Sequence, residues 1–136
     1  MIYIAGPLTD PDPQQQRNNV DVALRAYLEL TRCKIGAICP HLAALDTRAF
    51  EVSYDHWITQ GLKQLELCQG IWMLPRWHTS TGALTELLHA RKYQIRVYYS
   101  LEGVLQHYTP SVLLERNGYA PVYFEDKAEY TNRLPI

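Results

Sequence analysis

Ile71-Trp72-Met73-Leu74, the turn from Pro75 to Thr79 and the run Ser80-Thr81-Gly82-Ala83-Leu84-Thr85-Glu86 decide the fold of this chain. Four successive apolar residues followed by a proline are typical of a buried strand, and residues 80–92 follow a helical pattern. Ser80 or Thr79 is a suitable N-cap for that helix. The stretch therefore predicts a strand, a turn and a helix that carries the carboxylate of Glu86 about a turn and a half from its start.

The alternation of strand and helix continues on both sides of this unit. Further strands are expected at 1–5, 35–39 and 95–99, and further helices at 14–32, 53–67 and 101–107. Strands that alternate with helices over a hundred residues predict an α/β fold, a parallel sheet with helices on both faces. The connection from His41 to Val52 shows no regular pattern, and such connections often carry function when they lie over a strand end.

The whole chain, residues 1–136, is expected to be a single domain. With 47% hydrophobic residues it is long enough for one core and too short for two ordinary ones. In the extension at 108–136 the apolar residues are scattered. A strand at Val122-Tyr123-Phe124 is one interpretation of this extension, and a segment that crosses to a partner subunit is another.

Charge and composition exclude several function classes. A net charge of -1 leaves no basic footprint for a nucleic-acid polymer or an anionic membrane. No signal sequence or membrane-length apolar run is present, so a cytoplasmic location is expected. The three cysteines form no CxxC pair, and no histidine lies at metal-ligand spacing from another histidine or a cysteine. We therefore expect no disulfide framework, no metal site and no cofactor.

The carboxyl ends of the strands are the expected ligand site, because open parallel sheets bind ligands where their strand order reverses. The loop after Gly6, the connection after His41 and the 80–86 segment converge there. Gly82 lies four residues before Glu86 on the same helix face, and it leaves space in front of the carboxylate despite its low helix propensity. From spacing alone, a solvated helix glutamate is an equally good interpretation.

The expected ligand site at the strand carboxyl ends is called the crevice below. Other candidate residues near it also have purely structural interpretations. Gly6 permits a tight turn close to a ligand, and it is equally typical of an ordinary strand end. Tyr3 can point its hydroxyl into the crevice, although a strand tyrosine more often belongs to the core. Trp77 can stack on a base or simply occupy an exposed turn.

Five motifs occur in order and at suitable spacing over residues 1–100: Ile2-Tyr3-Ile4-Ala5-Gly6-Pro7, Asn19-Val20, Pro40-His41-Leu42, Leu74-Pro75-Arg76-Trp77 and Ser80-x-Gly82-Ala83-x-x-Glu86. As a set they resemble the nucleoside 2-deoxyribosyltransferase-like superfamily, and within it the small domains of unknown function common in bacteriophages and prophages. The resemblance implies a flavodoxin-like sheet of order 2-1-3-4, with the possible strand at 122–124 as a fifth.

The resemblance also implies an activity, namely cleavage or transfer at the N-glycosidic bond of a nucleoside or nucleoside 5′-monophosphate. Glu86 matches the family's nucleophile, and Tyr3 matches a tyrosine that positions it. The implied substrate-binding residues are Gly6, Pro7, Thr9, Asn19, His41, Trp77, Ser80 and Gly82. A homodimer or larger homo-oligomer, in a bacterial or phage-infected cell, is expected by the same resemblance.

Two acidic residues common in the superfamily are replaced here, by Gly61 and Gln69. A proton for the leaving base must then come from another group, and the possible acids are Asp55, Asp46 and His56. The alternative is a catalytically impaired protein of the same fold that binds or sequesters a nucleotide. A third hypothesis is an interaction protein in which the aromatic-rich tail is the functional part.

Overall fold

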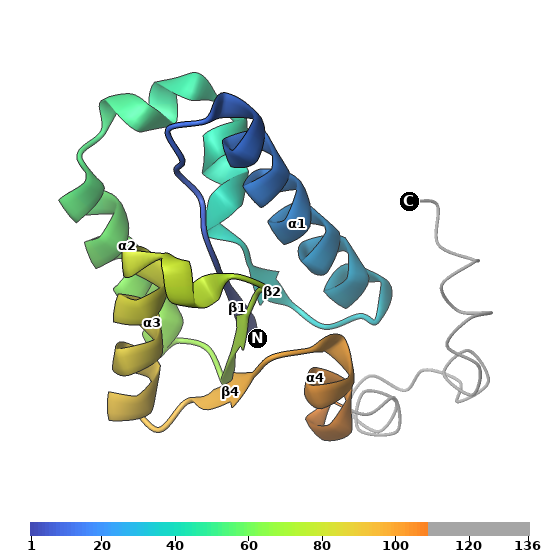
Figure 1. The fold of residues 1–136 in the computed structure, drawn as a ribbon. Helices are drawn as coiled ribbons and strands as arrows, with labels where there is room; N and C mark the ends of the chain where they lie inside the picture. Colours follow the sequence, from blue (N-terminus) through green and yellow to red (C-terminus); the bar gives the residue numbers. More distant parts are fainter. Residues whose placement is uncertain (109–136) are drawn as a thin grey trace.

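The computed structural model describes residues 1–108, which form a four-stranded parallel sheet in the order β2-β1-β3-β4 (Figure 1). The strands are β1 (Ile2–Ala5), β2 (Ala37–Ile38), β3 (Gly70–Met73) and β4 (Arg96–Tyr98). In the central strand, Tyr3 is opposite Ile38 on one side and Ile71 on the other. The predicted α/β class and strand order are therefore confirmed, whereas the strand expected at 122–124 and the extension from residue 109 lie outside the described residues.

Helices cover both faces of the sheet because β1 buries side chains alternately on each face. Ile2 and Ile4 pack in one core with α1 (Pro13–Arg32) and α4 (Leu101–His107). Tyr3 and Ala5 pack in the other core with α2 (Tyr54–Glu66) and α3 (Thr81–Lys92). Figure 1 shows the two helix pairs on opposite sides of the strands. None of the helices within residues 1–108 is both long and apolar enough to cross a membrane.

Two segments differ from the sequence expectation. The expected strand at 35–39 is reduced to Ala37–Ile38, because the amide of Ile35 instead donates to the Leu30 carbonyl and closes the end of α1 (2.9 Å). The connection expected to be irregular forms two short 3₁₀ helices, η1 (Pro40–Leu45) and η2 (Thr47–Glu51). Local i to i+3 hydrogen bonds satisfy this backbone without any apolar periodicity in the sequence.

Strand order reverses between β1 and β3, and the loops that follow these strands leave toward opposite faces of the sheet. The loop after β1 leads to α1, whereas the loop after β3 passes through η3 (Trp77–Thr79) to α3. The Leu74 amide donates to the Ala5 carbonyl (2.8 Å), and a Cβ on Gly6 would lie 2.9 Å from the Leu74 Cβ. Gly6 therefore allows the two loops to approach one another closely at the crevice.

Gly70→Ala should lower the free energy of unfolding by about 1–3 kcal/mol, because a buried site there has no room for a methyl group. An added Cβ would lie 2.5 Å from Tyr98 Cε2 and 2.9 Å from Ile2 Cδ1. Gly36→Ala is the matched control, since its Cβ would meet only the Met1 side chain, at 3.5 Å or more. Urea denaturation should show a change within about 0.5 kcal/mol for the control. Equal effects of the two substitutions would contradict this packing.

Candidate functional site

Glu86 is a buried carboxyl group on the side of α3 that faces the sheet. Its exposed fraction is 8%, and its Oε2 accepts a hydrogen bond from the hydroxyl of Tyr3, which is 1% exposed. Burial raises the pKa of Glu86 to about 7, although the bond from Tyr3 acts in the opposite direction. Glu86 therefore changes its charge near neutral pH, in the range where a carboxyl group is useful as an acid, base or nucleophile.

Tyr3 remains a hydrogen-bond donor throughout this pH range. Burial raises the pKa of its phenol far above the ordinary value, and the neighbouring charge and hydrogen bond of Glu86 raise it further. Tyr3 is thus both a core residue, as its strand position allowed, and the partner of Glu86.

Two glycines allow tyrosine side chains to pack closely against α2 and α3 near this pair. A Cβ on Gly61 of α2 would lie 2.6 Å from the Tyr3 hydroxyl and 3.5 Å from Glu86 Oε2. A Cβ on Gly82 would lie 3.2 Å from the hydroxyl of Tyr54. Gly61 therefore lies beside the carboxylate, but it has no room for a side chain while Tyr3 bonds to Glu86 as it does here.

Tyr54 is a candidate that the sequence analysis missed. It begins α2 and is 57% exposed, with its hydroxyl beside Gly82. Partial burial raises its pKa, and the charge of Glu86 raises it as well. Tyr54, Ile58 and Gly61 are spaced i, i+4, i+7 and so lie on one face of α2. Following this face to the first residue of the helix would have identified the Tyr54 hydroxyl as a candidate.

Ser80 is the N-cap of α3. Its Oγ accepts a hydrogen bond from the Ala83 amide (3.1 Å), which starts the helix that carries Glu86. Because the hydroxyl accepts in this bond, its own proton remains available to a ligand.

Asn19 and His41 hold the loop after β1 rather than projecting freely into the crevice. The Asn19 side chain donates to the Leu8 carbonyl (3.1 Å), and His41 Nε2 donates to the Pro7 carbonyl (2.9 Å). Both side chains are buried, and burial lowers the pKa of His41, so the imidazole is neutral. His41 Nδ1 has no hydrogen-bond partner among the described residues. Thr9 in the same loop is exposed.

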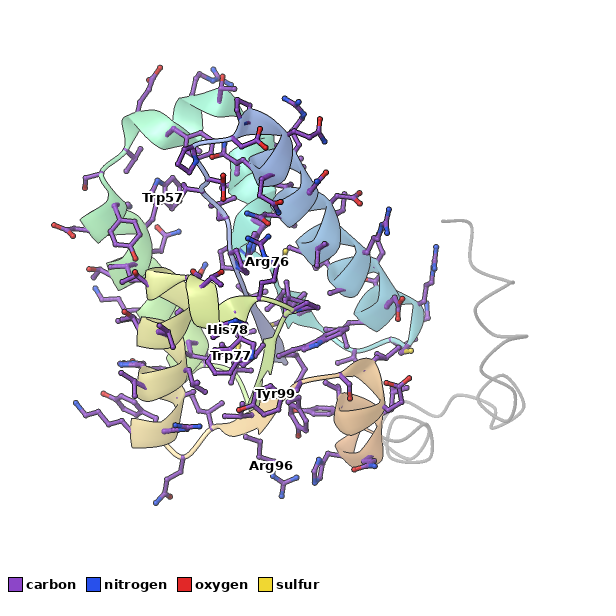
Figure 2. The ribbon with its side chains drawn as sticks, viewed as in Figure 1. Trp57, Arg76, Trp77, His78, Arg96 and Tyr99 are labelled. Atoms are coloured by element: carbon purple, nitrogen blue, oxygen red, sulfur yellow. The ribbon has the colours of Figure 1, made fainter. Side chains whose placement is uncertain are left out.

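Trp77 lies against the α2–α3 core instead of standing free in the turn. Its ring centroid is 6.0 Å from that of Tyr99 and 5.9 Å from that of His78, and Figure 2 shows the three rings together. Base stacking on Trp77 remains a prediction.

The possible acids are all exposed. Asp46 accepts hydrogen bonds from Arg48, which lower the pKa of its carboxyl and make it a poor proton donor. Asp55 and His56 lie in the first turn of α2. Gln69 lies at the opposite end of the sheet, where its amide donates to the Met1 carbonyl (3.0 Å), so its side chain is remote from the strand carboxyl ends.

The described side chains indicate no metal site, and two of the cysteines are unreactive core residues. Within residues 1–108, no group of three or more His, Cys, Asp and Glu side chains is placed to hold a metal ion. Cys39 and Cys68 are buried, and burial raises the pKa of each thiol, that of Cys39 to about 11. These thiols stay protonated and act as small core side chains.

Glu86→Gln should stabilise the protein at alkaline pH by on the order of 3 kcal/mol. The folded-state pKa of Glu86, about 7, lies above the ordinary 4.5. The stability that this group contributes is therefore complete below about pH 4.5 and is lost as the pH rises through 7. Gln is neutral at every pH and can still accept from Tyr3. Urea denaturation at pH 4.5, 6 and 8 should show a difference that grows with pH, and parallel profiles would contradict a buried carboxyl.

Gly61→Ala should destabilise the wild type by about 1–3 kcal/mol, although this change within a helix is ordinarily stabilising. The clash is with the Tyr3 hydroxyl, and the next contact, with Glu86 Oε2, is an ordinary 3.5 Å. In a Tyr3→Phe background the same substitution should be neutral or stabilising. A double-mutant cycle by urea denaturation measures this coupling, and equal costs in both backgrounds would show that the hydroxyl is not the obstacle.

Residues 1–99 match the model of a protein family described as "Domain of unknown function (DUF4406)". The matched segment runs from β1 past the end of β4, so it includes Tyr3, Gly61 and Glu86. No curated protein and no solved structure gives a significant match. Because the match covers well over half of the 136 residues, this chain belongs to the DUF4406 family.

Proposed function

We propose that this protein hydrolyses or transfers the N-glycosidic bond of a nucleoside or nucleoside 5′-monophosphate, with Glu86 as the nucleophile. The observation that carries this proposal is the buried pair of Glu86 and Tyr3, whose hydrogen bond requires the absence of a side chain at Gly61. The resemblance of the motif set to the nucleoside 2-deoxyribosyltransferase-like superfamily supports the same reaction. A buried carboxylate can both stabilise an oxocarbenium-like sugar and add to its anomeric carbon.

In the proposed reaction, the ionised carboxylate of Glu86 attacks the anomeric carbon through the oxygen that Tyr3 does not engage. The bond between that carbon and the base nitrogen breaks, and its electron pair leaves with the base, which takes up a proton from water. Water or a second base then attacks the same carbon and releases Glu86. Two displacements retain the configuration of the sugar.

Tyr54 and Ser80 are the proposed donors to the substrate. Both hydroxyl groups border Gly82, at 3.2 and 3.8 Å from the position that its Cβ would take. The raised pKa of Tyr54 keeps its proton in place, so the hydroxyl can donate to the leaving base or the sugar. This role suits Tyr54 better than Asp46, which Arg48 holds in its ionised form.

A second candidate function is nucleotide binding without turnover. It is favoured by Gly61, which leaves no acid beside Glu86, and by Gln69, which lies at the other end of the sheet. Such a protein binds a nucleotide at the strand carboxyl ends and sequesters it intact.

The proposal includes a homo-oligomeric assembly and a cytoplasmic location. Leu84 and Leu88 are exposed on consecutive turns of α3, at 38% and 65%. An apolar strip of this kind is compatible with a homodimer or larger homo-oligomer. We propose such an assembly in the cytoplasm of a bacterial or phage-infected cell.

Glu86→Gln and Glu86→Ala should each lower base release by at least about a thousandfold, because they remove the nucleophile. Base release from a panel of nucleosides and 5′-monophosphates is followed by chromatography, with the exposed Glu29→Gln as the matched carboxylate control. Wild-type release should rise as the pH passes through 7, because attack requires the ionised carboxylate. Equal activity of wild type and Glu86→Gln would exclude the nucleophile. Tight binding with no released base would favour the second candidate.

A further inference from the structure

A hollow of about 260 Å³ lies on the α1 side of the sheet, at the carboxyl ends of β1 and β3. Pro7 from the loop after β1 lines one wall, and Leu74 and Pro75 from the loop after β3 line another. The hollow therefore lies where the strand order reverses, which is the usual ligand position in open α/β sheets. Glu86 is not among its lining residues and faces the α2–α3 side.

Nitrogen donors from two parts of the chain converge on this hollow. Asn19 is 6% exposed, and its side-chain oxygen accepts from Gln15 Nε2 (2.9 Å) and from Arg76 Nη1 (3.4 Å). Figure 2 shows Arg76 between the start of α3 and the inner side of α1. Gln15 has one further N–H and Arg76 has four that these bonds do not use. Asn19 thus brings Gln15 and Arg76 together, and their remaining N–H groups are available at the hollow.

The backbone of Arg76 is unusual, and helix termination does not explain it. Its φ of 65° lies in the left-handed region, as do those of Lys34 and Gln94, which follow the ends of α1 and α3. Arg76 instead precedes η3, where glycine would adopt this conformation without strain. The chain keeps a long cationic side chain at a position that strains its backbone, which is typical of functional positions.

The charge at the hollow is also uncompensated. Its lining residues include no carboxylate, and within residues 1–108 no acidic side chain pairs with Arg76. An exposed guanidinium that Asn19 holds by one hydrogen bond, with a neighbouring amide donor and no carboxylate, suits an oxyanion, and phosphate in particular.

We infer that this hollow binds a phosphate group, with Arg76 as its anchor. Its volume is below the roughly 300–1,000 Å³ typical of pockets that enclose whole ligands, so it suits the anionic end of a small molecule. The source of the phosphate is either the free ion or a mononucleotide. This inference concerns binding alone and does not rest on chemistry at Glu86.

The test follows the side-chain amide signals of Gln15 and Asn19 by ¹⁵N NMR during titration with inorganic phosphate, a nucleoside 5′-monophosphate and the corresponding nucleoside. Arg76→Gly removes the guanidinium and relieves the left-handed backbone, so this variant should fold at least as well as the wild type. Arg76→Lys keeps the charge without the planar fork. Arg25→Ala is the matched control, since it removes an exposed arginine of α1 that pairs with Asp21.

Phosphate-bearing probes should shift both amide signals, and Arg76→Gly should weaken their binding at least tenfold. Arg76→Lys should have an intermediate effect, and Arg25→Ala should change binding less than twofold. Tighter binding of the monophosphate than of inorganic phosphate would identify a nucleotide as the source, whereas equal affinities would identify the free ion. Binding of no phosphate probe, or equal binding by wild type and Arg76→Gly, would overturn the inference. A protein that binds phosphate here but releases no base would overturn only the proposed catalysis.

Discussion

The burial of Glu86 is the constraint on which the α2–α3 half of this protein depends. A carboxyl group removed from water loses free energy of solvation unless it is protonated or hydrogen-bonded, and here burial raises its pKa while Tyr3 supplies the bond. That bond requires a tyrosine in the central strand and the absence of a side chain at Gly61. The buried carboxyl group of Glu86 thus explains why β1 has a tyrosine at position 3, why α2 has a glycine at position 61, and why the two pack so closely.

The β1 side of the crevice is organised by a different set of polar contacts. Asn19 and His41, which come from separate elements, bond to successive carbonyl groups of the loop after β1. Gly6 then allows this loop to lie against Leu74. Buried side chains therefore fix the backbone of the loop that borders the crevice. A ligand that binds there meets a loop that is already in position.

Sequence patterns were sufficient for the main helices and strands and their succession along the chain, because hydrophobic periodicity reports burial directly and parallel strands require helical crossovers. The strand order within the sheet was indicated by the family resemblance. They were less reliable where local hydrogen bonding decided the outcome. β2 lost residues to the closure of α1, and η1 and η2 formed without periodicity. Among site residues, Glu86 and Tyr3 were indicated by their spacing and by family resemblance. Tyr54 was missed because the sequence analysis did not follow the helix face that it shares with Ile58 and Gly61 back to the first residue of α2.

The sequence by itself determined the α/β class, the position of Glu86 one turn after Gly82 on the same helix face and the arrival of several loops at one edge of the sheet. These properties follow from period and spacing within single segments. Only the tertiary structure decided that Glu86 is buried against Tyr3, that Gly61 cannot accept a side chain beside them, and that Arg76 meets Asn19 across the crevice. Each of these facts joins residues more than twenty positions apart, and contacts of that kind are set by how the helices pack on the sheet rather than by any local pattern.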